Sequence, residues 1–276
     1  MRPVLFFLGI ATGMVVFMLV KRTPAQDAAA PQTAAQVTSV PVVVELFTSE
    51  GCSSCPPADQ LLAKLEADQP IKNVEIIALE EHVDYWNNGG WMDPFSSDSA
   101  TIRQYAYAGA IGNGNAYTPQ MVVDGQSEFV GSRERQARGA IEQAASRKKI
   151  EVSVTSGQHE ADGTQTVHIS VGPLAGSSGG DAPEVWLAIT EAKLHSDVRG
   201  GENSGQDLHH ASVVRKLKKI EGVKVTDGHS FSSEERVKFD RGWKRENTRV
   251  VVFVQEKKSK KILGAGSTTL LLRGLL

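Results

Sequence analysis

Hydrophobic positions change their pattern along the chain, and these changes predict its elements. Residues 42–47 and 74–79 are apolar runs rich in β-branched residues, which is typical of buried strands. Between the two runs, leucines recur at helical spacing over residues 56–67. A strand, a helix and a strand joined by short connections predict a βαβ unit with two parallel strands.

The following stretch predicts the rest of an α/β domain. Residues 80–116 form an aromatic and glycine-rich insert, with a helix expected near residues 100–107. Residues 121–130 contain two short apolar runs around a glycine, a pattern that predicts a β-hairpin. Residues 132–148 then keep helical periodicity after a good N-cap residue. The order βαβ, insert, ββα predicts one α/β domain over residues 41–149.

The pattern changes again near Lys149, where helical periodicity gives way to strand after strand. Linkers rich in Gly, Ser and Asp separate these runs. The expected strands cover residues 150–155, 166–171, 185–194, 212–217, 249–255 and 262–271. Residues 150–276 are therefore predicted to form a second domain, an all-β antiparallel sandwich.

The N-terminus has the pattern of a targeting segment. An apolar run over residues 3–20 ends at Lys21 and Arg22, and residues 23–40 form a tether rich in Ala, Gln, Thr and Pro. Residues 1–22 are either a cleaved signal peptide or an uncleaved membrane anchor, because the two basic residues argue against cleavage without excluding it. Either alternative predicts a periplasmic or secreted protein, in the second case tethered to the membrane through residues 3–20.

Composition narrows the functional classes. The chain has 276 residues, of which 40% are hydrophobic and 22% charged, which excludes a disordered, collagen-like or multi-span membrane protein. Its net charge of -2 gives no basic field, so we expect no nucleic-acid partner. Two cysteines are too few for a disulfide-rich scaffold.

The two cysteines nevertheless carry the strongest chemical signal. Cys52 and Cys55 follow the first predicted strand and stand where the first helix begins. At a helix N-terminus, unpaired amides and the helix dipole stabilise a thiolate. We expect Cys52 to be the more exposed sulfur that attacks a client disulfide, and Cys55 to resolve the mixed disulfide. The lack of a second pair excludes a four-thiolate zinc site within one chain.

Residues 117–121, with the sequence Tyr-Thr-Pro-Gln-Met, precede the predicted hairpin. Here the chain resembles the thioredoxin superfamily, which places a cis-proline beside its Cys-x-x-Cys pair. The resemblance implies a cis bond before Pro119 and a backbone contact from Thr118 to bound peptide. It also implies that Glu45 is the buried acid that helps proton transfer. The alternative for Glu45 is a salt-bridged strand residue.

The chain after the tether also resembles a family of predicted secreted thioredoxin-like proteins that is known only as a domain of unknown function. The matching blocks are residues 44–59, 82–86, 91–95, 117–125 and 201–210. The resemblance covers roughly residues 40–270. It implies the α/β thioredoxin-like fold and an extracytoplasmic location, and it implies no substrate.

The favoured function is therefore thiol–disulfide exchange with protein or peptide thiols, with no cofactor. One alternative is a copper-binding protein that uses Cys52, Cys55 and His82, as in Sco-like copper chaperones. His82 and Asp84 follow the second strand and should emerge at the same sheet edge as Cys52. We favour a structural His82 that caps the strand and orders the insert. A third alternative is a partner-binding module whose disulfide is a permanent staple.

Two further groups of side chains offer candidate sites. His209 and His210, with His195 and Glu202, offer metal ligands, but adjacent residues on a strand point to opposite faces. We therefore expect no metal to be bound by both. The insert also carries an aromatic group, which we expect to be a small core rather than a client platform. Its members are Tyr85, Trp86, Trp91 and Phe95.

Overall fold

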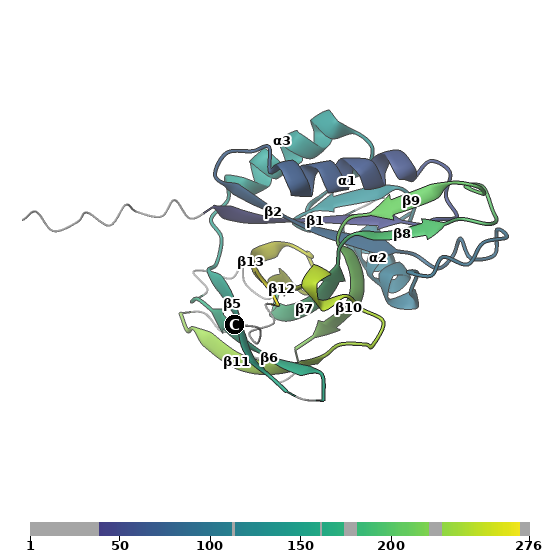
Figure 1. Cartoon of the computed structure of the whole chain (residues 1–276). Helices are drawn as coiled ribbons and strands as arrows, with labels where there is room; N and C mark the ends of the chain where they lie inside the picture. The colour runs from purple at the N-terminus through teal and green to yellow at the C-terminus, as the bar shows by residue number, and fades with distance from the viewer. Residues whose placement is uncertain (1–38, 112–113, 161, 174–180, 221–227, 271–276) are drawn as a thin grey trace, which may run out of the picture. The chain divides into compact units, whose positions relative to one another are not determined.

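The computed structural model describes residues 39–111, 114–160, 162–173, 181–220 and 228–270 (Figure 1). They belong to one compact unit, Val37–Leu276. The predicted targeting segment and all but the last two residues of the tether lie outside the described residues. Within the described part, no helix is both long and apolar enough to cross a membrane.

An eight-stranded mixed sheet organises the molecule, in the order β13-β12-β7-β10-β2-β1-β3-β4. Its strands are β1 (Val40–Thr48), β2 (Val74–His82), β3 (Gln120–Val123), β4 (Ser127–Val130), β7 (Pro183–Glu191), β10 (Val213–Lys219), β12 (Thr248–Glu256) and β13 (Ile262–Thr269). The predicted βαβ unit is confirmed, because β1 and β2 pair in parallel from Val40 with Val74 to Thr48 with His82. This register brings the carboxyl ends of both strands to one edge, where the cysteines and His82 follow.

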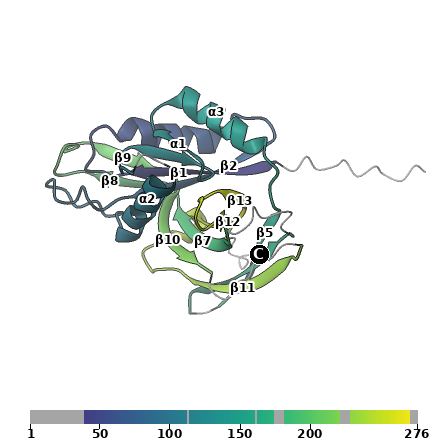
Figure 2. The ribbon, with the colours of Figure 1, turned by 180° about the vertical axis from the view of Figure 1, so that it is seen from behind.

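Three helices cover the two faces of the first four strands. Helices α1 (Pro56–Asp68) and α3 (Glu134–Ala145) lie on one side of the sheet, and α2 (Asp98–Ala110) lies on the other (Figures 1 and 2). Alternate residues of β1 explain this arrangement. Val42, Val44 and Leu46 pack with α1 and α3. Phe47, on the opposite face, packs with Tyr107 of α2.

A second sheet, of three strands, covers the C-terminal part of the large sheet. It contains β5 (Val152–His159), β6 (Thr164–Val171) and β11 (Phe231–Lys238), in the order β11-β6-β5. Its valines and isoleucine pack with alternate residues of β7 and β12 in one hydrophobic core. The short helix η1 (Arg245–Asn247) precedes β12.

The strands after Lys149 do not form a separate sandwich domain, which corrects the expectation from the sequence. β10 joins the edge of β2, where Val213 pairs in parallel with Glu80. The far strand β13 also returns toward the first half, because the Ile262 amide donates to the carbonyl oxygen of Asp124 at 3.0 Å. The edge of β2 needs a hydrogen-bonding partner, and residues distant in sequence supply it.

A separate hairpin stands over the end of the sheet that carries the cysteines. Its strands are β8 (Leu194–Asp197) and β9 (Asp207–His210), which pair only with each other among the described residues. They pack beside α1. The sequence analysis extended one strand to residue 194 and did not predict β8 and β9 as a hairpin.

Candidate functional site

A disulfide joins Cys52 and Cys55 at the point where β1 leads into α1. The Cα atoms of the two residues are 5.4 Å apart. Cys55 is the N-cap of α1, and its carbonyl oxygen accepts the Ala58 amide at 2.8 Å. Pro56 follows at the first helical position, where no amide hydrogen is needed. The pair therefore lies at the helix terminus that favours a thiolate.

Both cysteines are buried, so the greater exposure expected for Cys52 is not seen. The exposed fraction is 1% for Cys52 and 0% for Cys55. The loop between β8 and β9 lies over the pair: Asn203 donates to the carbonyl oxygen of Cys52 at 3.0 Å, and Glu202 accepts the Ser53 amide at 3.0 Å. Sequence reasoning could not show this contact, because about 150 residues separate the two segments.

Trp86 of the insert closes the other flank of the cysteine loop. A Cβ placed on Gly51 would lie 3.1 Å from the Trp86 Cβ, so the chain can pass here only with a glycine or with a shift of the tryptophan. The Trp86 indole donates to Thr118 Oγ1 at 2.8 Å. Trp86 therefore links the cysteine loop to the segment before β3.

The Thr118–Pro119 peptide bond is cis, as expected. A Cβ placed on Gly131 would lie 3.0 Å from the Ala58 Cβ and 3.4 Å from the Pro119 Cβ. Pro119 thus lies close to the first turn of α1, in the vicinity of the disulfide. Among the residues predicted for the site, the cysteines, Thr118 and Pro119 gather at one place.

Glu45 lies elsewhere, in a buried polar network on the α2 side of the sheet. Its carboxylate accepts hydrogen bonds from the guanidinium of Arg103, at 3.1 Å from Nη2, and from the Tyr107 hydroxyl. Glu81 is also within ion-pair distance of Arg103. Burial and the nearby charge of Glu45 raise the pKa of Glu81, and Arg103 lowers it. The net effect holds this pKa well above its usual value. These contacts match the alternative for Glu45, a salt-bridged strand residue.

Asp59 is a buried acid in the first turns of α1, close to the disulfide, and it was not predicted from the sequence. It lies one helical turn after Cys55, so the two side chains share a face of α1. Its carboxylate accepts the Thr48 hydroxyl at 2.6 Å. Burial and the nearby charge of Glu80 raise the pKa of Asp59 to about 7. The signal in the sequence was an acid four positions after Cys55 in a predicted helix.

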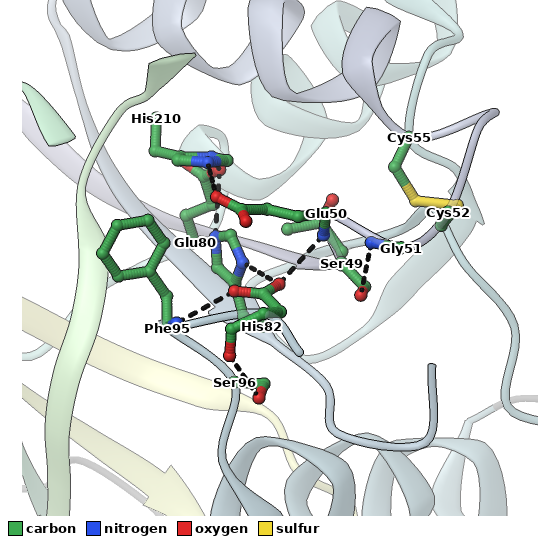
Figure 3. A network of polar contacts seen from close by, with 12 residues as sticks. Ser49, Glu50, Gly51, Cys52, Cys55, Glu80, His82, Phe95, Ser96 and His210 are labelled. Atoms are coloured by element: carbon green, nitrogen blue, oxygen red, sulfur yellow. Dashed lines mark hydrogen bonds and ion pairs between the residues drawn. A yellow bond between two sulfur atoms is a disulfide. The ribbon is translucent and has the colours of Figure 1, made fainter. Parts of the chain in front are cut away.

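Two histidines and three carboxylates form a buried cluster behind the cysteine loop (Figure 3). His82, at the end of β2, places Nδ1 at 2.7 Å from Asp93 Oδ2. His210, at the end of β9, places Nδ1 at 2.8 Å from Glu80 Oε1 and Nε2 at 3.0 Å from Glu50 Oε1. Figure 3 shows Glu50 between the histidines and the segment that leads to the disulfide.

Charge in this cluster is balanced by mutual hydrogen bonds. Burial opposes ionisation of Glu80, but the hydrogen bond from His210 and the neighbouring His82 outweigh it and lower the pKa of Glu80 to about 2. Burial likewise opposes charge on His210, and the carboxylates of Glu50 and Glu80 raise its pKa to about 9. For His82, the Asp93 carboxylate overcomes burial and holds the pKa well above its usual value.

His82 orders the insert, as favoured from the sequence. The same Asp93 oxygen that faces His82 accepts the Glu50 amide at 2.9 Å, and the carbonyl oxygen of His82 accepts the Ser97 amide at 3.0 Å. The set of Cys52, Cys55 and His82 is not brought together as metal ligands. Among the described residues, the group with metal-ligand geometry consists of Glu80, His82 and His210.

The other candidate ligands separate as expected for neighbours on a strand. His209 and His195 are exposed and contact Asp207, each at 3.1 Å, whereas His210 points into the buried cluster. Glu202 lies at the cysteine loop instead.

The aromatic residues of the insert divide between core and surface. Phe95 packs on His82 and His210, with ring centroids 5.5 and 5.3 Å away. The Trp91 indole donates to Glu50 Oε2 at 2.7 Å. Tyr85 keeps 36% of its surface exposed and lies tilted beside Trp86, 6.5 Å between ring centroids. The four side chains are exposed or partly buried and contact different partners, so the single small core expected from the sequence is not seen.

Two solved structures are similar to this chain to different extents. Protein AGR_C_4864 from Agrobacterium tumefaciens is 27% identical, with a TM-score of 0.58 over 86% of this chain and 97% of that one. A domain of the outer membrane lipoprotein Omp28 from Porphyromonas gingivalis is 13% identical, with a TM-score of 0.29 over 45% of this chain and 88% of that one. Among curated proteins, none matches. A family model matches residues 43–255, and the chain therefore belongs to the family described as "Protein of unknown function (DUF1223)".

Proposed function

We propose that this protein carries out thiol–disulfide exchange through Cys52 and Cys55, in a thioredoxin-like frame and outside the cytoplasm. The observation that carries the proposal is the Cys52–Cys55 disulfide at the N-terminus of α1. At this place the helix terminus stabilises a thiolate, and the disulfide is the bond that thiol–disulfide exchange opens and closes. Disulfides persist in oxidising compartments, which supports an extracytoplasmic location.

The frame supports the thioredoxin-like part of the proposal. The strands run in the order β2-β1-β3-β4, with β1 parallel to β2 and antiparallel to β3. Helices α1 and α3 share one face, and α2 lies on the other. Pro119 follows a cis bond immediately before β3. In this frame Thr118 offers its backbone to a bound peptide beside the disulfide.

The exchange step starts from the disulfide form. A client thiolate attacks Cys52 Sγ, forms a bond to it and breaks the Cys52–Cys55 bond, so Cys55 leaves as a thiolate. A second client thiolate then attacks the client sulfur of this mixed disulfide and releases the Cys52 thiolate. The client gains a disulfide and loses two electrons, and the cysteine pair gains them. The reverse sequence reduces a client.

Asp59 is placed to donate a proton in this step. Its carboxyl has a pKa of about 7, because burial and Glu80 oppose its charge, so near neutral pH it exchanges a proton readily. It shares a helix face with Cys55 and is itself buried. Protonated Asp59 can therefore neutralise the Cys55 thiolate as the disulfide opens.

Client access requires movement of the loop between β8 and β9. Cys52 is 1% exposed while Asn203 and Glu202 hold this loop on the cysteine segment. Those contacts are two hydrogen bonds from Asn203 and one to Glu202, of which the last is at the exposed rim. The loop therefore acts as a cover that a client displaces.

The burial of both sulfurs also favours a second candidate, a permanent structural staple. Equilibration with glutathione buffers followed by thiol trapping separates the two functions. A reduction potential between about -120 and -270 mV is the range of exchange catalysts, and one below about -300 mV is that of structural disulfides. We expect the first.

Single-cysteine variants provide the second arm of the test. Cys55→Ser should accumulate a mixed disulfide with a peptide disulfide through Cys52, and Cys52→Ser should not. Gln60→Ala, an exposed change on α1 away from the sulfurs, is the control and should exchange like the wild type. Equal trapping by both single-cysteine variants would remove the assigned roles.

A further inference from the structure

We propose that Glu80, His82 and His210 bind a zinc ion, and that this ion fastens β9 to the end of β2. The three residues offer one carboxylate oxygen and two ring nitrogens that all lie within 4.8 Å of one another. All three side chains are buried. This site is separate from the cysteines and holds whether their disulfide is exchanged or permanent.

The distances from Glu80 Oε1 to the two histidine nitrogens are close to those around a tetrahedral ion, and the two nitrogens lie within 4.8 Å of each other. His82 Nε2 lies 3.4 Å from Glu80 Oε1, and His210 Nδ1 lies 2.8 Å from the same oxygen. Ligands at about 2.0–2.2 Å from zinc stand roughly 3.3–3.6 Å apart at the corners of a tetrahedron. The first pair already has this separation, and the second needs to widen by a few tenths of an ångström.

An unpartnered nitrogen points into this group. Among the described residues, His82 Nε2 is one of few buried side-chain atoms without a hydrogen bond, and the residue is 1% exposed. A buried polar atom without a partner is unfavourable, because it loses its contacts with water and gains none. A metal bond to Nε2 would satisfy it.

Each histidine has a carboxylate behind the nitrogen that faces away from Glu80. Asp93 Oδ2 lies 2.7 Å from His82 Nδ1, and Glu50 Oε1 lies 3.0 Å from His210 Nε2. A carboxylate that accepts one ring N–H fixes that nitrogen as the donor, so the other nitrogen binds the metal once zinc displaces its proton; this is the usual outer shell of a histidine zinc ligand. Glu50 is itself held by the Trp91 indole at 2.7 Å.

The donor set and its enclosure favour zinc. Two imidazoles and one carboxylate suit a borderline ion, whereas calcium and magnesium prefer oxygen ligands alone. Phe95 packs against both rings, at 5.5 Å from His82 and 5.3 Å from His210. Three protein ligands leave a fourth coordination position. Because His210 ends the hairpin whose loop covers Cys52, the ion would also hold that cover.

The test uses the full chain with its disulfide intact, so that no thiol is available to the metal. Protein from zinc-supplemented cells should retain one zinc per chain after gel filtration. X-ray absorption should show two imidazoles and no sulfur around the ion. Zinc far below one per chain, both as purified and after long equilibration of the chelated protein with zinc, would overturn the proposal. Sulfur in the zinc shell, or no imidazole, would overturn it as well.

The zinc affinities of single variants then test which residues bind the ion. Asp93→Asn removes an outer-shell carboxylate and should weaken zinc binding about 10–100-fold. His210→Gln removes a ligand and should weaken it more. His209→Gln, its exposed neighbour, is the matched control and should bind like the wild type. If His210→Gln folds and keeps wild-type affinity, the site is refuted; if it does not fold, the absorption spectrum of the wild type decides.

Discussion

The side-chain amide of Asn203 donates to two carbonyl oxygens of the cysteine loop, that of Glu50 at 2.8 Å and that of Cys52 at 3.0 Å. Asn203 is 1% exposed, although it belongs to a surface loop between two short strands. Asn203, in a hairpin distant in sequence, thus donates hydrogen bonds to carbonyl groups of a loop that lies outside the strands and helices.

Asn203→Ala should loosen this cover. The carbonyl oxygen of Glu50 loses its donor and that of Cys52 keeps only the Cys55 amide, so the free energy of unfolding should fall by about 1–3 kcal/mol. The disulfide should also be reduced faster by a small thiol, because Cys52 becomes accessible. Urea unfolding and the rate of reduction by dithiothreitol measure the two effects. Ser204→Ala, an exposed neighbour, should change neither. An unchanged reduction rate in Asn203→Ala would show that the loop does not control access.

Asp59 predicts a pH dependence of stability. Burial and Glu80 raise its pKa from 3.8 to about 7, so the folded state keeps a proton that the unfolded state has lost. Its contribution is complete below about pH 4 and is lost as the pH rises through about 7. The slope is at most about 1.4 kcal/mol per pH unit for one proton.

Asp59→Asn removes this titration. The difference in the free energy of unfolding between wild type and variant, measured in urea from pH 4 to pH 8, should shift in favour of the variant as the pH rises. A difference that is flat across this range would contradict the raised pKa. The exchange rate of the variant should also lose the pH dependence centred near 7 that we expect of the wild type.

Gly131 lies between Pro119 and Ala58 of α1. A Cβ there would lie 2.6 Å from Leu46 Cδ1 and 3.0 Å from the Ala58 Cβ. Gly131→Ala should therefore destabilise the protein by about 1–3 kcal/mol, because a close-packed core must shift. Gly139→Ala is the matched control: it lies inside α3 with nothing within 4 Å, so it should stabilise by about 0.5–1 kcal/mol. Thermal and urea unfolding of both variants give the sign directly.

Glu45 distinguishes a structural role from a redox role. Glu45→Gln removes one partner of a buried ion pair with Arg103 and should lower the free energy of unfolding by about 3–5 kcal/mol. The reduction potential of the cysteine pair should stay at the wild-type value. A comparable change at the partly exposed pair of Glu75 and Arg249, Glu75→Gln, should cost less than about 1 kcal/mol. A shifted potential in Glu45→Gln would restore the role implied by the thioredoxin resemblance.

Local patterns in the sequence predicted most of the elements and the place of the cysteine pair, although they did not predict the strands β8, β9 and β11. Apolar runs and helical spacing predicted β1, α1 and β2 to within a few residues, because periodicity reflects which face of each element is buried. The position of Cys52 and Cys55 between a strand and a helix identified the chemical site. The cis bond before Pro119 followed from resemblance rather than from any local rule.

Only the tertiary structure decided how the second half of the chain meets the first. The pairing of β10 with β2 and the seating of Asn203 on the cysteine loop join residues more than a hundred positions apart. A sequence pattern predicts that a strand forms, but it does not predict which other strand will pair with it. For the same reason, the polar residues that looked independent in the sequence, such as Glu80 and His210, became one buried cluster only when the chain folded. Cys52 is buried under the loop between β8 and β9, so a client can reach its sulfur only when this loop moves.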